Sequence, residues 1–201
     1  MLYYENRLKK QGFDLIIGVD EAGRGPLAGP VVAAAAALRT HRFKNRIDDS
    51  KKLSHKQREA GFLEIIDKSI FGLGIVGENT IDSINILEAT RLAMQRALDS
   101  LTDKLIFEKG FPDIFVLVDG NMRHNFPYPY LSITEGESKS LSIAAASIIA
   151  KVTRDRIMSY YDKLYPEYGF LKHKGYPTAS HRRKISEIGL SSIHRKTFCC
   201  V

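Results

Sequence analysis

The 201-residue chain has few of the features that mark secreted or membrane proteins. Its two cysteines are neighbours at positions 199 and 200, where a disulfide between them would be strained. We expect free thiols in a reducing cytoplasm. The sequence contains no run of about 18 apolar residues, which excludes an ordinary transmembrane helix. Its start, MLYYENRLKKQGFD, lacks the apolar core of a signal peptide.

Histidine and cysteine also form no cluster with the spacing of a zinc site, so zinc is not an expected cofactor. Positive charge is in excess: 30 Lys and Arg against 23 Asp and Glu give a net charge of +7. This balance favours a polyanionic partner such as nucleic acid. Hydrophobic residues make up 44% of the chain, as in globular proteins. We therefore expect one domain over residues 1–201, in which residues 1–14 precede the first strand.

Strand and helix patterns alternate along the chain, which predicts an α/β fold. The segment VVAAAAAL is ambiguous, because alanine favours helix. We interpret it as a strand, since a short run bounded by turns suits a hairpin partner of the preceding strand. A basic loop is expected at residues 170–176, after the longest helix. The expected strands are residues 15–20, 31–38, 71–77, 114–119 and 130–134, and the expected helices are 55–69, 79–101 (as one or two), 138–164 and 178–188.

Two of the apolar runs end in acidic residues. LIIGVD ends at Asp20, which Glu21 follows, and IFVLVD ends at Asp119. Ligand sites in open α/β sheets gather at strand ends, so these carboxylates are expected to lie close together and to repel one another. Oxygen ligands suit Mg²⁺ or Mn²⁺, and two such ions can clamp the oxygens of a phosphodiester. The alternative is that Asp20 and Asp119 are loop-capping residues, which are common after strands.

Five motifs, in order along the chain, resemble the type 2 ribonucleases H and specifically bacterial ribonuclease HII. They are GVDEAGRGPLAGPV from residue 18, DDSKKLS from 48, VDG from 118, AAASIIAKVTRD from 144 and KHKGYPT from 172, and the match extends to HRKTF at 194–198. The resemblance implies a ribonuclease H-like fold, with a five-stranded mixed sheet flanked by helices and a C-terminal helical part.

The same resemblance implies a metal-dependent endonuclease. Such an enzyme hydrolyses the RNA strand of RNA–DNA hybrids and nicks on the 5′ side of a single ribonucleotide in duplex DNA. The products have 3′-hydroxyl and 5′-phosphate ends, the cofactor is Mg²⁺ or Mn²⁺, and the role is ribonucleotide removal from DNA. We expect a monomer whose partners are RNA–DNA hybrids and ribonucleotide-containing DNA, with no membrane partner. No clear C-terminal tail supports binding to a replication clamp.

The family uses four acids as metal ligands and catalytic groups. The resemblance assigns Asp20, Glu21 and Asp119 to the first three positions. The fourth is usually the Asp of a Gly-Asp pair just before the long helix, where this chain has Gly136-Glu137. We expect Glu137 to be the fourth ligand, because a carboxylate near a helix N-terminus is favourably placed. The alternatives are Glu135 and weaker binding of one metal.

The resemblance also assigns substrate contacts. In the family the Gly23-Arg24-Gly25 element senses the ribose at an RNA–DNA junction; glycine allows close approach of the backbone, whose polar groups can bond a 2′-hydroxyl. Tyr176 matches the tyrosine that packs on the deoxyribose after the ribonucleotide. The expected phosphate contacts are Lys51, Lys139, Lys151, Arg154, His173 and Lys174, with Arg182, Arg183 and Lys184 either extending this surface or forming a solvated helix face.

Two other functions stay open. One is a catalytically weakened RNA–DNA hybrid-binding module of the same fold, and its only support is Glu137. The other is a resolvase or transposase core, which is expected to lack the paired GRG and KHKGY motifs. The type 3 enzymes carry an extra N-terminal domain, whereas few residues precede the first expected strand here.

Overall fold

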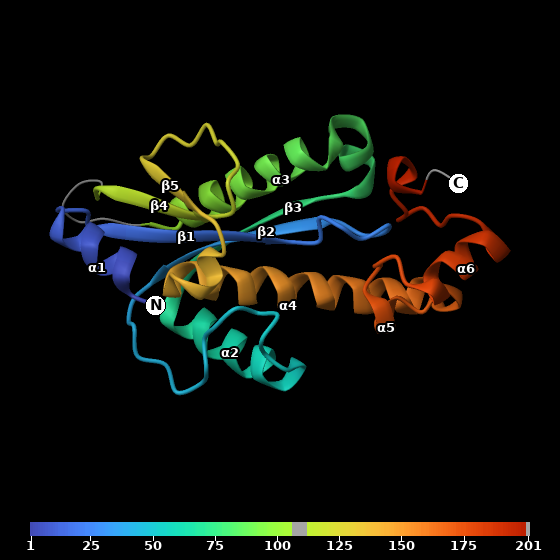
Figure 1. Ribbon diagram of the computed structural model, residues 1–201, viewed down its shortest axis with the longest axis horizontal. Helices are drawn as coiled ribbons and strands as arrows, with labels where there is room; N and C mark the ends of the chain where they lie inside the picture. The colour runs from blue at the N-terminus through green and yellow to red at the C-terminus, as the bar shows by residue number, and fades with distance from the viewer. Residues whose placement is uncertain (106–111, 200–201) are drawn as a thin grey trace.

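The computed structural model describes residues 1–105 and 112–199, and its centre is a five-stranded mixed sheet (Figure 1). The order across the sheet is β3-β2-β1-β4-β5. Strand β2 is antiparallel to both β1 and β3, whereas β4 runs parallel to both β1 and β5. This confirms the predicted fold class. The strands are β1 (Leu15–Ala22), β2 (Val31–Leu38), β3 (Ser69–Val76), β4 (Ile114–Asp119) and β5 (Tyr130–Ile133).

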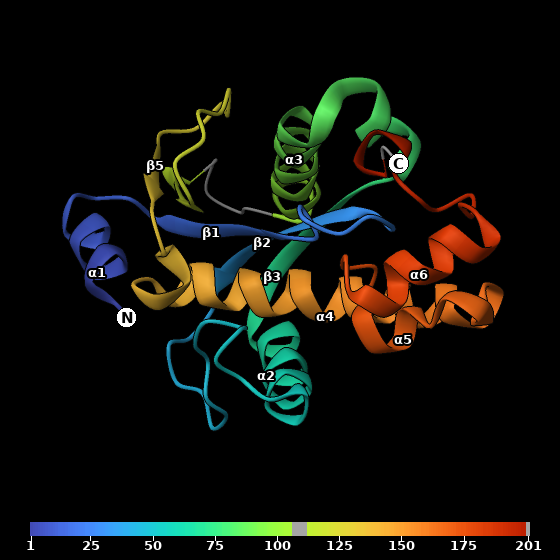
Figure 2. The same cartoon turned by 45° about the vertical axis from the view of Figure 1, so that its right-hand side comes forward.

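Helices cover both faces of the sheet (Figures 1 and 2). Helix α3 (Glu78–Thr102) packs on one face. Helix α4 (Leu141–Leu164) packs on the other face, and α2 (His55–Lys68) packs against α4. The short helices α5 (Phe170–His173) and α6 (Ala179–Ile188) lie near the C-terminal end of α4. No helix of the described segments is long and apolar enough to cross a bilayer.

The alanine-rich strand β2 is buried on both faces. Ala33 and Ala35 belong to the core beneath α3, whereas Ala34 and Ala36 belong to the core beneath α4. This alternation follows from the two-residue period of a strand. Small side chains at residues 33–37 let two helices sandwich the strand, so tertiary packing overrides the helical preference of alanine.

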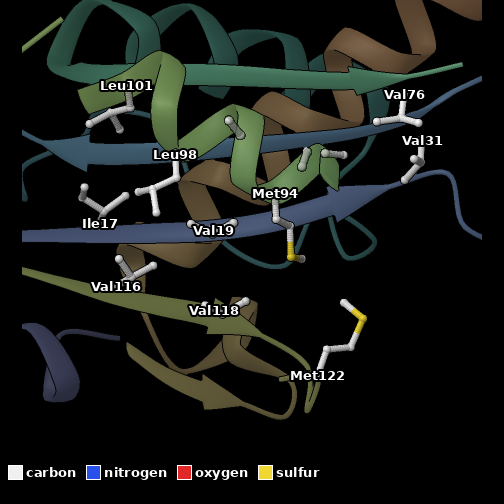
Figure 3. Close-up of a cluster of buried hydrophobic side chains, with 14 of the residues drawn as sticks. Ile17, Val19, Val31, Val76, Met94, Leu98, Leu101, Val116, Val118 and Met122 are labelled. Atoms are coloured by element: carbon white, nitrogen blue, oxygen red, sulfur yellow. The ribbon is translucent and has the colours of Figure 1, made fainter. Parts of the chain in front are cut away.

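Glycines bring the helices still closer to the sheet. A Cβ on Gly74 of β3 would lie 1.9 Å from the carbonyl oxygen of Ala93 in α3. A Cβ on Gly18 of β1 would lie 2.1 Å from the backbone of Ser142 in α4. Figure 3 shows the α3 side of this core, where Leu98 lies over the sheet near Ile17 of the same cluster.

Some helices differ from the expectation. Helix α1 (Tyr3–Lys10) was not predicted, because only Glu5 and Leu8 of its eight residues are buried and the apolar pattern is too short to read. The basic segment expected to be a loop at 170–176 contains α5. The long helix starts at Leu141, after a 3₁₀ turn at Gly136–Ser138.

Candidate active site

The acid-tipped strands lie side by side and end at the same edge of the sheet. Strands β1 and β4 are parallel, with Val19 opposite Val118, so Asp20 and Asp119 follow at adjacent positions. Together with Glu21 they line a cavity of about 230 Å³. The sheet topology therefore brings the three carboxylates together, as expected from the two strand ends.

The carboxylates disfavour one another's ionisation. Burial, with Glu21 and Asp119 nearby, raises the pKa of Asp20 well above its usual value. Burial also raises the pKa of Glu21, although the Arg24 guanidinium lies 3.3 Å from its Oε1. Burial and the neighbouring Glu137 raise the pKa of Asp119 to about 7. Concentrated negative charge of this kind favours a bound cation.

Glu137 lies beside Asp119 and away from solvent, with 6% of its surface exposed. Lys51 donates from Nζ to its Oε1 at 3.1 Å. Although burial alone would raise the pKa of Glu137, hydrogen bonds with Asp119 and Lys51 lower it. Gly136, the residue before Glu137, also contacts Asp119: its N–H donates to Asp119 Oδ1 at 2.7 Å. Glu135 is exposed, so the geometry favours Glu137 as the fourth acid.

These acids fit a divalent cation by their chemistry. Glu21 Oε2 and Glu137 Oε2 are buried and accept no hydrogen bond. Every candidate ligand is a carboxylate oxygen, the donor type that Mg²⁺ and Mn²⁺ prefer. Across residues 1–105 and 112–199, no three His, Cys, Asp or Glu side chains are already gathered as a metal site.

The two predicted substrate motifs meet at the same cavity. Gly23, Arg24 and Gly25 line it together with Tyr176. A Cβ on Gly25 would lie 3.9 Å from Tyr176 Cε1, so the motifs face each other closely. Lys51 and Lys151 also line the cavity, and Lys151 Nζ pairs with Asp155 at 2.7 Å.

Sequence reasoning missed two serines in this site. Ser50 and Ser147 line the cavity, and the Ser147 hydroxyl donates to Ser50 Oγ at 2.9 Å. A hydrogen bond with Ser147 also lowers the pKa of Asp20, against the larger effect of burial. Both serines lie inside motifs that carry the resemblance, which is the signal that could have identified them.

Two predicted phosphate contacts, His173 and Arg154, are buried and do not line the cavity. His173 is buried; its Nε2 bonds the Tyr168 carbonyl at 2.9 Å, and its Nδ1 accepts the N–H of Gly175 at 3.2 Å. Arg154 is 1% exposed, and its guanidinium is held by backbone carbonyls. Each ring or guanidinium nitrogen of these two side chains already bonds a protein group, which argues against phosphate contacts from either one.

Two predicted lysines point to protein partners instead of the cavity. Lys174 Nζ donates to Ser159 Oγ at 3.0 Å. Lys139 Nζ donates to the Thr134 carbonyl at 2.6 Å. Neither lysine lines the cavity, so Lys51 and Lys151 are the lysines best placed beside the acids.

Known proteins are similar to this chain over nearly its whole length. A family model for ribonuclease HII matches residues 17–201. The chain is 48% identical to a ribonuclease HII of Syntrophotalea carbinolica, over 98% of this chain and 91% of that protein. It is 49% identical to a ribonuclease HII of Geobacter sulfurreducens, over 97% of this chain and 87% of that protein.

A solved structure shares the fold as well. The crystal structure of ribonuclease H2 from Pyrococcus horikoshii superposes with a TM-score of 0.71 and 28% identity, covering 91% of this chain and 93% of that chain. The sequence comparison and the fold comparison both match type 2 ribonucleases H, over more than nine tenths of this chain. The chain belongs to the ribonuclease HII family, whose members are endonucleases that hydrolyse the RNA strand of RNA–DNA hybrids.

Proposed function

We propose that this protein also nicks duplex DNA on the 5′ side of a single embedded ribonucleotide, leaving 3′-hydroxyl and 5′-phosphate ends, and so starts ribonucleotide removal from DNA. The observation that supports this is the meeting of Gly23-Arg24-Gly25 and Tyr176 at the cavity that Asp20 and Asp119 line. Backbone groups that can bond a 2′-hydroxyl lie beside the carboxylates. An aromatic ring that can pack on a neighbouring sugar completes a site suited to an RNA–DNA junction.

The acids have a defined part in this reaction. Asp20, Glu21, Asp119 and Glu137 would hold Mg²⁺ or Mn²⁺. When bound, two such ions supply the charge that stabilises the attacking and leaving oxygens of an in-line displacement at phosphorus. The chain's own cations add to substrate binding, since the Nζ groups of Lys51 and Lys151 at the cavity can neutralise neighbouring phosphates.

An end-labelled DNA duplex with one ribonucleotide tests the proposal, incubated with Mg²⁺ and separately with Mn²⁺. We expect a single nick 5′ of the ribonucleotide, which Asp119→Asn abolishes because a neutral amide cannot replace the carboxylate. The all-DNA duplex is the control and should stay intact. Tight binding without a nick in either metal would contradict the proposal and favour the hybrid-binding module.

The same assay identifies the fourth acid. Glu137→Ala should remove Mg²⁺-dependent cleavage, whereas Glu135→Ala should stay within a few-fold of the wild type, because Glu135 is exposed and Glu137 lies beside Asp119. Glu137→Asp then measures the effect of the longer side chain. Equal activity of the wild type and Glu137→Ala would remove Glu137 from the site.

A further inference from the structure

Two arginines hold the Gly23-Arg24-Gly25 loop from inside the protein. Arg154 in α4 is 1% exposed, and Arg195 near the C-terminus is 0% exposed. A buried guanidinium is unfavourable unless its donors are bonded. The hydrogen bonds that these two side chains donate all go to backbone carbonyls.

Arg195 binds the carbonyls of the loop itself. Its Nη2 donates to Gly23 O at 2.6 Å, and its Nη1 donates to Arg24 O at 2.9 Å. The same guanidinium reaches Gly29 O from Nε at 2.9 Å and from Nη2 at 2.7 Å. Its backbone N–H donates to Leu27 O at 2.8 Å. The planar fork therefore fixes both ends of the loop that follows β1.

Arg154 connects this loop to the loop of Tyr176. Its Nε donates to Pro30 O at 3.0 Å, and its Nη2 donates to Ala28 O at 3.1 Å. Its Nη1 donates to Lys174 O at 3.0 Å. Its guanidinium also lies over the Tyr176 ring, 5.9 Å from the centroid. The two substrate loops therefore share one internal anchor.

The carbonyl bonds determine which backbone groups of the loop can meet a substrate. In a trans peptide the C=O and the following N–H point in opposite directions. Because the carbonyls of Gly23 and Arg24 point to Arg195, the N–H groups of Arg24 and Gly25 point away from it. These residues line the cavity. Among the hydrogen bonds of the described residues, neither N–H donates to a protein acceptor.

The two glycines of the motif differ in why the structure has glycine at each position. Gly23 has φ +99°, and a Cβ there would lie 2.1 Å from Arg154 Nε, so the internal arginine requires this glycine. Gly25 meets only Tyr176 Cε1, at 3.9 Å. Packing inside the protein therefore explains Gly23, whereas no such contact requires Gly25, and close approach of a substrate stays the prediction for Gly25.

We propose that Arg195 is a positioning residue for ribose recognition: by binding the carbonyls of Gly23 and Arg24, it presents the N–H groups of Arg24 and Gly25 as donors to the 2′-hydroxyl. Arg154 supports this arrangement through the neighbouring carbonyls of Ala28 and Pro30. The inference rests on the proposed recognition of a ribonucleotide in DNA. Lysine cannot replace Arg195, because a single ammonium cannot form the same fork of bonds.

Binding without cleavage tests this directly. In an Asp119→Asn background, affinities are measured for a duplex with one ribonucleotide and for the same duplex with deoxyribose throughout. We expect the wild-type loop to prefer the ribonucleotide, and Arg195→Lys to reduce that preference by about 3- to 10-fold, the effect of one hydrogen bond. Arg156→Lys, an exposed arginine of α4 that pairs with Glu59, is the matched control and should keep it.

A second measurement covers the case in which Arg195→Lys fails to fold. Amide NMR of the Asp119→Asn protein should show shifts at Arg24 and Gly25 that are larger with the ribonucleotide duplex than with the all-DNA duplex. Equal shifts, or a folded Arg195→Lys variant with undiminished preference, would overturn the positioning role. No ribonucleotide preference in the parent protein would instead overturn the proposed function itself.

Discussion

Main-chain hydrogen bonds hold Tyr176 in place, and its aromatic ring is exposed. Its N–H donates to the carbonyl of His173 at 2.9 Å, and its carbonyl bonds His181 Nδ1 at 2.9 Å. Its ring is 42% exposed at the cavity. Because main-chain bonds hold the residue in place, removal of the ring should alter the substrate surface more than the fold.

Tyr176→Ala should therefore lower kcat/KM on a single ribonucleotide by about 10-fold or more, the range of one lost stacking contact. On a long RNA–DNA hybrid, where no junction is read, the loss should be clearly smaller. The measurement is a parallel kinetic assay on both substrates. Tyr160→Ala, at a tyrosine of α4 that is 60% exposed, is the control. Equal losses on the two substrates would contradict junction reading by Tyr176.

The residues at the site differ in how far the sequence could predict them. Asp20 and Asp119 were predictable, because an acid at the end of a buried strand keeps its place wherever the strands pair in parallel. Arg154 was not, because a basic residue inside a motif reads as a phosphate contact until its burial is known. Burial depends on how the whole molecule packs, so a local sequence pattern does not show it. Arg195 and His173 are also buried, and the sequence did not indicate this for either residue.

At the scale of elements, α1 is connected to the start of α4 by a buried carboxylate. Glu5 is 2% exposed, and its Oε1 accepts from the N–H of Ser142 at 3.0 Å. The hydroxyls of Ser140 and Ser142 donate to the same oxygen at 2.6 Å and 2.9 Å. A carboxylate here also suits the positive end of the α4 dipole. Helix α1 thus stabilises the helix that follows the Glu137 turn.

Glu5→Ala should lower the free energy of unfolding by about 2–3 kcal/mol, because it leaves buried donors without their charged acceptor. Urea denaturation followed by circular dichroism provides the measurement. Glu5→Gln keeps one acceptor oxygen and should lose less. Arg7→Ala, at an exposed position of the same helix, should change stability by under about 0.5 kcal/mol. Similar losses for Arg7→Ala and Glu5→Ala would show that Glu5 has no special role.

Helices and strands with a long enough pattern of apolar residues were predictable from the sequence, and the short helices were not. The strand character of β2 follows from its place after β1, which outweighs alanine propensity. Helix α3 shows φ 66° at Asn85, a break that agrees with the expectation of one or two helices. Helices α1 and α5 owe their form to contacts with distant residues, such as Glu5 with Ser142, and no local pattern records such contacts.

The molecule as a whole carries a net charge of +7, yet its cavity contains a group of acids. The cavity combines Asp20, Glu21 and Asp119 with Lys51 and Lys151. Net charge alone would attract a nucleic acid to many parts of the surface. We expect Lys51 and Lys151 to give this attraction a location, because their ammonium groups can neutralise phosphates that lie beside the acids.

The salt dependence of binding can distinguish lysines that contact phosphates from lysines that only add net charge. In the Asp119→Asn background, the slope of log affinity against log salt for a labelled hybrid should fall by about 0.9 with Lys51→Ala, since one phosphate contact is lost. Lys174→Ala should change the slope less, because Lys174 does not line the cavity. Lys10→Ala, at the exposed last residue of α1 and outside the cavity, is the control for net charge. A slope that falls equally in all three variants would mean that overall charge, and not the lysine beside the cavity, governs binding.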